Sequence, residues 1–486
     1  MDSATRDKYQ PVIGLEVHAQ LLTSSKIYSS DSTAFGAQPN SQVGVITLAH
    51  PGTLPKLNKQ VVEHAIKMGL ACHSEISRYQ IFDRKNYFYP DLPKGYQLTQ
   101  DRTPICVGGY VKVSTRDEKD IKVKLNRIHI EEDAGKSIHV EDQPYTWVDL
   151  NRAGVPLIEI VTEPVIRGAE EAGAFLAEIR KIVRYLQICD GNMEEGSLRC
   201  DANISVMLKG ATTLGKKVEV KNMNSIRNVQ RAIEFEIERQ ISELENGRTI
   251  SSETRTFDMG TGKTNGMRTK EELNDYRYFP DPDLSPLIVS EEWLKEIKSS
   301  MPTLPEEMEQ RLIEVYQLPA YDAQVLTESR EMVLYFEEVA QHCNSYKAIS
   351  NWLMGPVKSY LNENNLSDRQ FVIEPARLAE MIQLVESGKI SFTAASQKLF
   401  PAMILDPDVQ PMELAASLDL LQDSDEESIT QIVEDVLNSF PAKVTEYKKG
   451  KKGLISMFMG EVMRRTKGKA DPKLTNGVLI KKLTEI

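Results

Sequence analysis

Three short stretches of the sequence alternate apolar and polar residues with a period of two, and this alternation constrains the fold more than any other feature. In PVIGLEVHAQL, residues 11–21, the odd positions are apolar, while Glu16 and His18 occupy even ones. RIHIEE at 127–132 and GSLRCDANISV at 196–206 repeat the pattern. Because successive side chains of a strand point to opposite faces, each stretch predicts a strand with one buried face.

The polar faces of these predicted strands carry similar residue types. His129 and Glu131 lie on one face, and Asp201 and Asn203 on another. Such a face is commonly just solvated, but solvated faces usually mix Lys, Thr, Glu and Arg. Carboxylates with an occasional imidazole suit Mg²⁺, which prefers oxygen ligands. Zinc would require more His or Cys at tighter spacing.

Two other chemistries are excluded or disfavoured. Gly-Lys-Ser at 135–137 resembles the end of a phosphate loop, but that motif needs a glycine at position 130, which is isoleucine. No Gly-x-Ser-x-Gly or comparable nucleophile arrangement is visible. Cys200 falls on the apolar face of its strand, which indicates a buried structural thiol.

A strand that leads into a helix forms a candidate anion site. Residues 218–221 alternate, Ser225 is a good N-cap, and an apolar stripe continues to Gly247. Free N–H groups at the helix start, flanked by Lys221 and Arg227, suit an anion such as a phosphate. An ordinary lysine on a strand edge is an equal alternative for Lys221.

Aromatic and cationic residues are concentrated in FDRKNYFYPDLPKGYQLTQ, 82–100, which predicts a loop or hairpin. Aromatic faces such as Tyr87, with Lys85 and Lys94 nearby, suit a nucleotide or an RNA end. A packed aromatic cluster is the alternative. NDYRYFPDPDL, 274–284, has the same character.

The hydrophobic pattern of the sequence changes along the chain, and this change predicts an α+β protein. The first 290 residues or so are strand-rich, and helical patterns follow from Glu291. We expect a large cradle domain with a mixed or antiparallel sheet at 1–292, a helical domain at 293–408 and a small helical tail domain at 409–486. The second boundary follows a proline cluster.

Composition adds constraints on compartment and partners. The five cysteines are odd in number and scattered, no membrane-length apolar run occurs, and the first ten residues contain no signal-like segment. A cytoplasmic protein is therefore expected. From Pro441 onward, twelve Lys or Arg and four Asp or Glu give +8, which leaves −20 on the rest of a chain whose formal net charge is −12.

This basic segment predicts a helix that binds RNA, although a solvated helix face is the usual reason for such charge. Its expected apolar stripe is Leu454, Met457, Phe458 and Val462. The cations predicted to contact tRNA are Lys448, Lys449, Lys451, Lys452, Arg464, Arg465 and Lys467.

Seven of the segments resemble, in order, those of the B subunit of the aspartyl/glutamyl-tRNA(Asn/Gln) amidotransferase. They are GLEVHAQL, DRKNYFYPDLPKGYQ, HIEEDAGKS, VDLNRAGVPLIEIVTEP, EEGSLRCDANIS, EVKNMNSIRNVQRAIEFE and DYRYFPDPDL. The resemblance spans about residues 10–290 and continues in LPAYDA, NWLMG and the basic tail.

The resemblance implies a two-step ligase reaction in a bacterial-type cytoplasm. ATP phosphorylates the side chain of Glu or Asp misattached to tRNA(Gln) or tRNA(Asn), and ammonia then displaces the phosphate. In this family an amidase, the A subunit, makes the ammonia from glutamine, while a small C subunit tethers the heterotrimer. ATP and Mg²⁺ are the implied cofactors. A non-catalytic tRNA-binding scaffold and a ligase for a free small acid are the alternatives.

The resemblance also implies site residues. The metal ligands would be Glu16, His18, Glu132 and Asp201. The catalytic residues would be Lys85, Glu131, Glu159 and Asp201. ATP contacts are expected from Tyr87, Lys221, Ser225 and Arg227. Strict alternation turns Glu131, not Glu132, toward the side of His129, so both acids stay open as the metal ligand.

One loop departs from the family pattern. Many members carry four cysteines that bind zinc there, whereas this sequence has Ser29, Asp31, Gly44 and Thr47. Zinc is therefore not expected. We expect packing around Tyr28 and Leu48 to order the loop instead.

Overall fold

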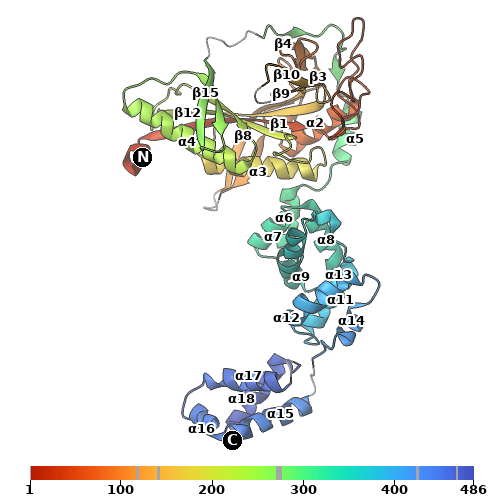
Figure 1. The fold of residues 1–486 in the computed structure, drawn as a ribbon, viewed down its shortest axis with the longest axis vertical. Coiled ribbons are helices and arrows are strands. Elements are labelled where there is room, and N and C mark those ends of the chain that lie inside the picture. The colour runs from red at the N-terminus through yellow and green to blue at the C-terminus, as the bar shows by residue number, and fades with distance from the viewer. Residues whose placement is uncertain are drawn as a thin grey trace. The chain divides into compact units, whose positions relative to one another are not determined.

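A large mixed sheet organises the N-terminal part of the chain (Figure 1). The structure is a computed structural model that describes residues 2–115, 120–139, 143–269, 276–422, 426–466 and 469–485. These divide into two units, 1–305 and 306–486. The predicted α+β class is confirmed, with the sheet in the first unit and helices throughout the second.

The strands of this sheet follow the order β15-β14-β13-β12-β1-β11-β8-β6-β2, and β7 pairs with β8. Only β13 and β14 pair in parallel among the described strands of this sheet. Their bounds are β1 (Tyr9–Gln20), β2 (Glu75–Ile76), β6 (Cys106–Val107), β7 (Tyr110–Ser114), β8 (Asp120–Glu132), β11 (Pro156–Thr162), β12 (Leu198–Leu208), β13 (Val218–Met223), β14 (Glu253–Asp258) and β15 (Lys263–Thr269).

Strand register brings the predicted polar faces together. Glu16 on β1 pairs with Asp201 on β12. On the other edge of β1, His18 pairs with Glu159 of β11, which in turn pairs with His129 of β8. Four neighbouring strands therefore present acids and imidazoles on one continuous surface.

The opposite, apolar face of the sheet packs against helices α2 (Lys59–Ala71), α3 (Ala169–Tyr185) and α4 (Ile226–Glu245) (Figure 1). All three predicted strands bury their apolar positions, as Val17, Ile130 and Cys200 illustrate. The predicted helix start is also confirmed, because the Ser225 hydroxyl accepts a hydrogen bond from the backbone N–H of Asn228.

The two aromatic stretches meet in a small sheet beside the large one. The first forms the predicted hairpin, β4 (Asp83–Asn86) and β5 (Tyr96–Thr99), and β16 (Phe279–Pro280) from the second pairs with β4. Residues 274 and 275 of the second stretch lie outside the described residues.

The remaining short elements of the N-terminal unit are α1 (Ser3–Arg6), β3 (Tyr79–Gln80) paired with β17 (Leu287–Ile288), β9 (Lys136–His139) paired with β10 (Thr146–Asp149), and α5 (Glu291–Ser299). Helix α5 buries Leu294 and Ile297 in the core of this unit. The unit boundary consequently follows Pro305, later than the predicted 292. The further division at 408 stays a prediction.

The C-terminal unit contains α6 (Pro305–Glu314), α7 (Ala320–Leu326), α8 (Arg330–Ala340), α9 (Tyr346–Trp352), α10 (Lys358–Glu363), α11 (Pro375–Glu386), α12 (Phe392–Ala394), α13 (Phe400–Leu405), α14 (Pro411–Ser417), α15 (Glu426–Ser439), α16 (Pro441–Lys448), α17 (Leu454–Arg465) and α18 (Pro472–Glu485). Helices α15 to α18 share a core that includes Phe458 and Val462. Met457, predicted to lie in that stripe, is exposed instead. No helix in the described ranges has the length and hydrophobicity needed to cross a membrane.

Candidate active site

The polar face of the large sheet forms the floor of a cavity of about 450 Å³. Its lining comes from six neighbouring strands, from the β4–β5 hairpin and from the segment after residue 275. The residues are Glu16, His18, Lys85, Thr99, Asp101, Arg127, His129, Glu131, Glu159, Asp201, Asn203, Lys217, Glu219, Lys221, Glu253, Thr254, Tyr276 and Tyr278. Polar groups dominate, and aromatic rings occupy one part of the wall.

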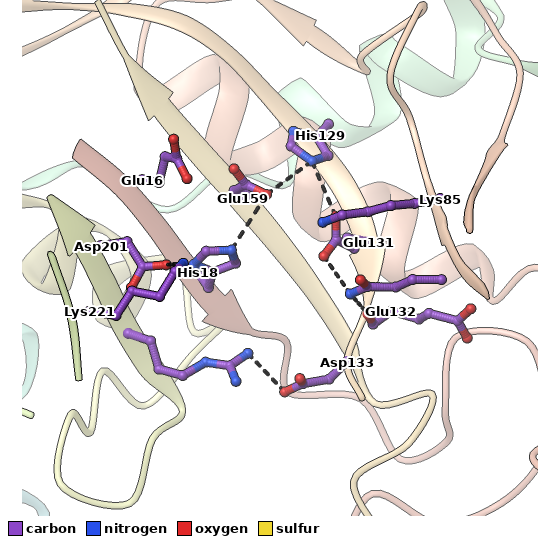
Figure 2. A network of polar contacts seen from close by, with 12 residues as sticks. Glu16, His18, Lys85, His129, Glu131, Glu132, Asp133, Glu159, Asp201 and Lys221 are labelled. Carbon is purple, nitrogen blue, oxygen red and sulfur yellow. Dashed lines mark hydrogen bonds and ion pairs between the residues drawn. The ribbon is translucent and has the colours of Figure 1, made fainter. Parts of the chain in front are cut away.

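Glu159 lies at the centre of the first cluster in this cavity (Figure 2). Its Oε2 is 3.3 Å from His129 Nε2 and 3.4 Å from His18 Nε2, and His129 is also 3.6 Å from Glu131. Burial alone would lower the pKa of His129, but the Glu159 and Glu131 carboxylates raise it to about 9. Burial opposes ionisation of Glu159, yet the two imidazoles hold its pKa well below the usual range.

A second cluster lies on the β12–β13 side of β1. Lys221 is 2.5 Å from Asp201 and 2.9 Å from Glu219. Asn203 donates a 2.9 Å hydrogen bond to Glu16. Burial and the charges of neighbouring carboxylates raise the pKa of Glu16, so this acid lacks sufficient positive charge nearby.

Lys85 provides a half-buried positive charge in the same cavity. Its ammonium group is 4.0 Å from Glu131, 5.3 Å from the centre of the Tyr276 ring and 6.0 Å from that of Tyr87. Burial would lower the pKa of Lys85, but Glu131 and other anionic neighbours raise it. The lysine is therefore charged, and its ammonium lies beside Glu131 (Figure 2).

The donor atoms of the cavity fit divalent metal ions. One set is His129, Glu131 and Glu159, and the other is Glu16, Asp201 and Glu219. In each set the possible ligand atoms lie within 4.8 Å of one another. Five of the six residues offer carboxylate oxygens, the ligand type that Mg²⁺ prefers.

Glu132 lies apart from both sets, contrary to its expected role as a metal ligand. It points away from Glu131 (Figure 2) and pairs with Lys94, whose ammonium is 2.7 Å from Oε2. It also accepts a 2.8 Å hydrogen bond from the backbone N–H of Leu98. Because strand β8 continues through residue 132, alternation turns the two acids to opposite faces. Of the two open alternatives, the structure therefore places Glu131 beside His129.

Three expected ATP contacts also lie outside the cavity lining. The Ser225 hydroxyl caps its own helix, and Arg227 is exposed to solvent. Tyr87 donates a 2.7 Å hydrogen bond to Gln97, and the centre of its ring lies 5.9 Å from that of Tyr276. Lys221 does reach the cavity, but Asp201 and Glu219 already neutralise its charge. It is therefore neither a free cation for an anion site nor an unpaired lysine on a strand edge.

Sequence reasoning placed Asn203 on the polar face without giving it a role, and it assigned no role to Glu219. Glu219 and Asn203 share their strand faces with Lys221 and Asp201, so alternation alone was a sufficient signal for both. Asp133, which is not part of the cavity lining, accepts hydrogen bonds of 2.9 Å from Arg199 and 2.7 Å from Gln20, far apart in the chain. No local pattern predicts that contact.

The loop that lacks the four cysteines is held by a carboxylate. Oδ2 of Asp31 accepts hydrogen bonds from Ser29 Oγ at 3.0 Å, Gly44 N at 2.8 Å and Thr47 Oγ1 at 2.5 Å. Tyr28 is buried as expected, but Leu48 is 37% exposed and so does not form a buried anchor for the loop. Hydrogen bonds to Asp31 connect the four positions instead.

The predicted tRNA-binding cations of α16, α17 and their connection are all exposed where described. Several are already paired within the unit. Lys451 is 3.1 Å from Glu446, and Arg464 and Arg465 are 2.6 and 3.2 Å from Glu461. Lys467 lies outside the described residues.

Comparisons with known proteins agree with this architecture. Residues 11–295 match the GatB/GatE catalytic domain family, and residues 334–483 match the GatB domain family. The B subunit of the aspartyl/glutamyl-tRNA(Asn/Gln) amidotransferase of Thermodesulfovibrio yellowstonii is 47% identical, and the alignment covers 98% of this chain and 100% of the relative. The protein of the same name from Chlorobium phaeobacteroides is 49% identical, with 98% and 99% covered. The chain therefore belongs to the family of aspartyl/glutamyl-tRNA(Asn/Gln) amidotransferase B subunits.

Proposed function

We propose that this chain activates and amidates the side chain of Glu or Asp misattached to tRNA. In the first step ATP would phosphorylate the side-chain carboxylate. Ammonia would then displace the phosphate to give Gln-tRNA(Gln) or Asn-tRNA(Asn). One observation carries the proposal: two carboxylate-rich donor sets and the half-buried Lys85 line a single cavity.

The roles of the residues follow from the demands of phosphoryl transfer, which depends on positioning and charge neutralisation. Glu16, Asp201 and Glu219 on one side, and His129, Glu131 and Glu159 on the other, would hold Mg²⁺. Bound Mg²⁺ would neutralise phosphate charge. Lys85 would add a fixed positive charge beside Glu131 where negative charge develops. His18 would orient Glu159 through their 3.4 Å contact.

Partners follow from the names of the relatives, which describe one component of a larger amidotransferase. We propose two partners in a cytoplasmic heterotrimer: an amidase, the A subunit, which supplies ammonia from glutamine, and a small C subunit. The basic C-terminal helices would bind the tRNA.

The test uses the assembled complex with mischarged Glu-tRNA, ATP and Mg²⁺ but no ammonia donor. We expect wild type to form an alkali-labile phosphorylated aminoacyl-tRNA and Asp201→Ala to form none. Glu75→Ala, which alters an exposed acid of β2, is the control. Equal formation by the Asp201 variant would favour the second candidate, a tRNA-binding scaffold whose acids are structural.

A further inference from the structure

The two ends of the cavity differ in chemistry. At the β13–β14 end, Lys217, Lys221 and Glu253 are charged and offer no flat apolar face. At the other end, Tyr276 and Tyr278 form part of the wall. A ligand that combines charged phosphates with a flat ring would therefore have only one suitable place for its ring along the described lining.

The tyrosines at this end form a continuous row of rings. The centre of the Tyr276 ring is 5.9 Å from that of Tyr87 and 6.0 Å from that of Tyr278, with interplanar angles of 70° and 66°. Tyr87 is held in turn by its hydrogen bond to Gln97. Edge-to-face packing of this kind fixes the positions of the rings, and Lys85 lies over the Tyr276 ring, 5.3 Å from its centre.

The backbone that carries Tyr276 and Tyr278 is anchored to the hairpin. The backbone N–H of Asn86 donates a 2.9 Å hydrogen bond to the carbonyl of Tyr276, and the Asn86 side chain donates to the carbonyl of Arg277 at 3.0 Å. Arg277 has a φ of 44°, a conformation that non-glycine residues rarely adopt. Such backbone strain is typical of segments that position functional side chains.

Tyr278 nevertheless remains open to a ligand. The residue is 37% exposed, although it lines the cavity. The Asp101 carboxylate lines the same end and can accept a hydrogen bond from an exocyclic amine. Arg127 donates a 3.0 Å hydrogen bond to the backbone carbonyl of Asp101, and its guanidinium lies 3.9 Å from the Asp101 carboxylate.

We propose that Tyr278, held by the Tyr276 ring packed at 66° to it, forms a stacking wall for an adenine ring, with the acidic clusters next to it receiving the phosphates or the aminoacyl group. The inference rests on the proposed function, and both of its substrates contain adenine: ATP in its base, and aminoacyl-tRNA in its 3′-terminal adenosine. Stacking on an aromatic side chain is tolerant of orientation and suits either source.

The experiment uses the assembled complex and Tyr278→Leu, which removes the ring but keeps an apolar side chain. We expect KM for one substrate to rise about fivefold or more, since stacking contributes roughly 1–3 kcal/mol per base, while kcat at saturation stays within about twofold. Tyr278→Phe keeps the ring and should retain the wild-type KM. Tyr79→Leu, which removes an exposed ring of β3, is the matched control.

The outcomes separate the two sources of adenine. A rise confined to KM for ATP assigns the wall to the nucleotide, and a rise confined to KM for aminoacyl-tRNA assigns it to the terminal adenosine. Three results would each overturn the proposal. They are unchanged KM values, an equal rise in KM with Tyr79→Leu, and a rise in KM for both substrates, which would indicate that the segment is displaced.

Failure of the proposed function gives a different result. If the proposed function is wrong, the Asp201→Ala complex stays active. The stacking wall is tested independently of activity, by fluorescence titration of the complex with a non-hydrolysable ATP analogue. There, an unchanged Kd in Tyr278→Leu excludes ATP as the source of the ring.

Discussion

The backbone N–H of Gly44 donates a 2.8 Å hydrogen bond to the Asp31 carboxylate, and a Cβ atom at Gly44 would overlap that carboxylate. We therefore expect Gly44→Ala to lower the free energy of unfolding by about 1–3 kcal/mol, the usual cost of overpacking. Chemical denaturation of the isolated chain, followed by tryptophan fluorescence, measures this.

Two controls isolate the cause. Gly14→Ala should cost less, because its Cβ would meet only ordinary contacts at 3.9 Å. In an Asp31→Ala background, the cost of Gly44→Ala should shrink, because the group that it overlaps is gone. A zinc chelator should leave the unfolding temperature unchanged, since none of the four positions carries a cysteine that could bind zinc. Full additivity of the two substitutions would contradict the assignment.

Glu131 and Glu132 are adjacent in sequence but face different surroundings, which separates their expected phenotypes. Glu131→Gln should lower the rate of acyl-phosphate formation by about 10²–10³-fold, as expected for loss of a group that stabilises charge in the transition state. Glu132→Gln leaves Lys94 without its partner. It should instead lower the free energy of unfolding by about 1–3 kcal/mol. The reverse pattern in the single-turnover assay would show that Glu132 is the metal ligand.

Much of the sheet could be predicted from the sequence because alternation is a local signal. Ile13 and Glu16 reveal their faces through neighbours one or two residues away. The neighbours of each strand could not be predicted in the same way. Strand β11 lies between β1 and β8, and this order places Glu159 between two imidazoles. The order depends on pairing between segments that are distant in the sequence. Glu159 was accordingly identified by resemblance alone.

Side chains whose role in the structure differs from the predicted one were also beyond what local patterns can show. The absence of cysteines predicted a loop without zinc, but not that Asp31 would connect its four positions. Helix capping predicted the position of Ser225 correctly. Helix capping could not predict that the cavity does not reach this helix. The extent of the cavity depends on the contact between Lys221 and Asp201 of β12.

Because of His64, we expect the stability of the N-terminal unit to fall at acidic pH. This histidine of α2 is buried, and burial, with a smaller contribution from Lys67, lowers its pKa from 6.5 to about 4. Because the folded-state pKa is the lower one, the unfolded chain binds the proton first as the pH falls. The stability is therefore complete above about pH 6.5 and is lost toward pH 4, by about 3 kcal/mol at 1.36 kcal/mol per pKa unit.

The measurement is a series of denaturant unfolding curves between pH 7 and pH 4 for wild type and His64→Gln. The variant loses the titrating group, so its stability should fall less steeply over this range, whatever its absolute value at pH 7. His50→Gln, which alters another histidine of the same unit, serves as the control. Parallel curves for wild type and His64→Gln would exclude His64 as the cause.

The tail predicts a graded dependence of tRNA affinity on salt. Each phosphate that a lysine neutralises should contribute roughly 0.7–0.9 to the slope of log affinity against log salt. Lys448→Ser should therefore reduce the slope by about that amount. Lys451→Ser should reduce it less, because Glu446 lies 3.1 Å from that ammonium and already offsets its charge. Conversely, Glu446→Gln should steepen the slope. Filter binding of tRNA to the assembled complex between about 50 and 200 mM salt measures all three, and equal slopes in every variant would remove these helices from the tRNA-binding surface.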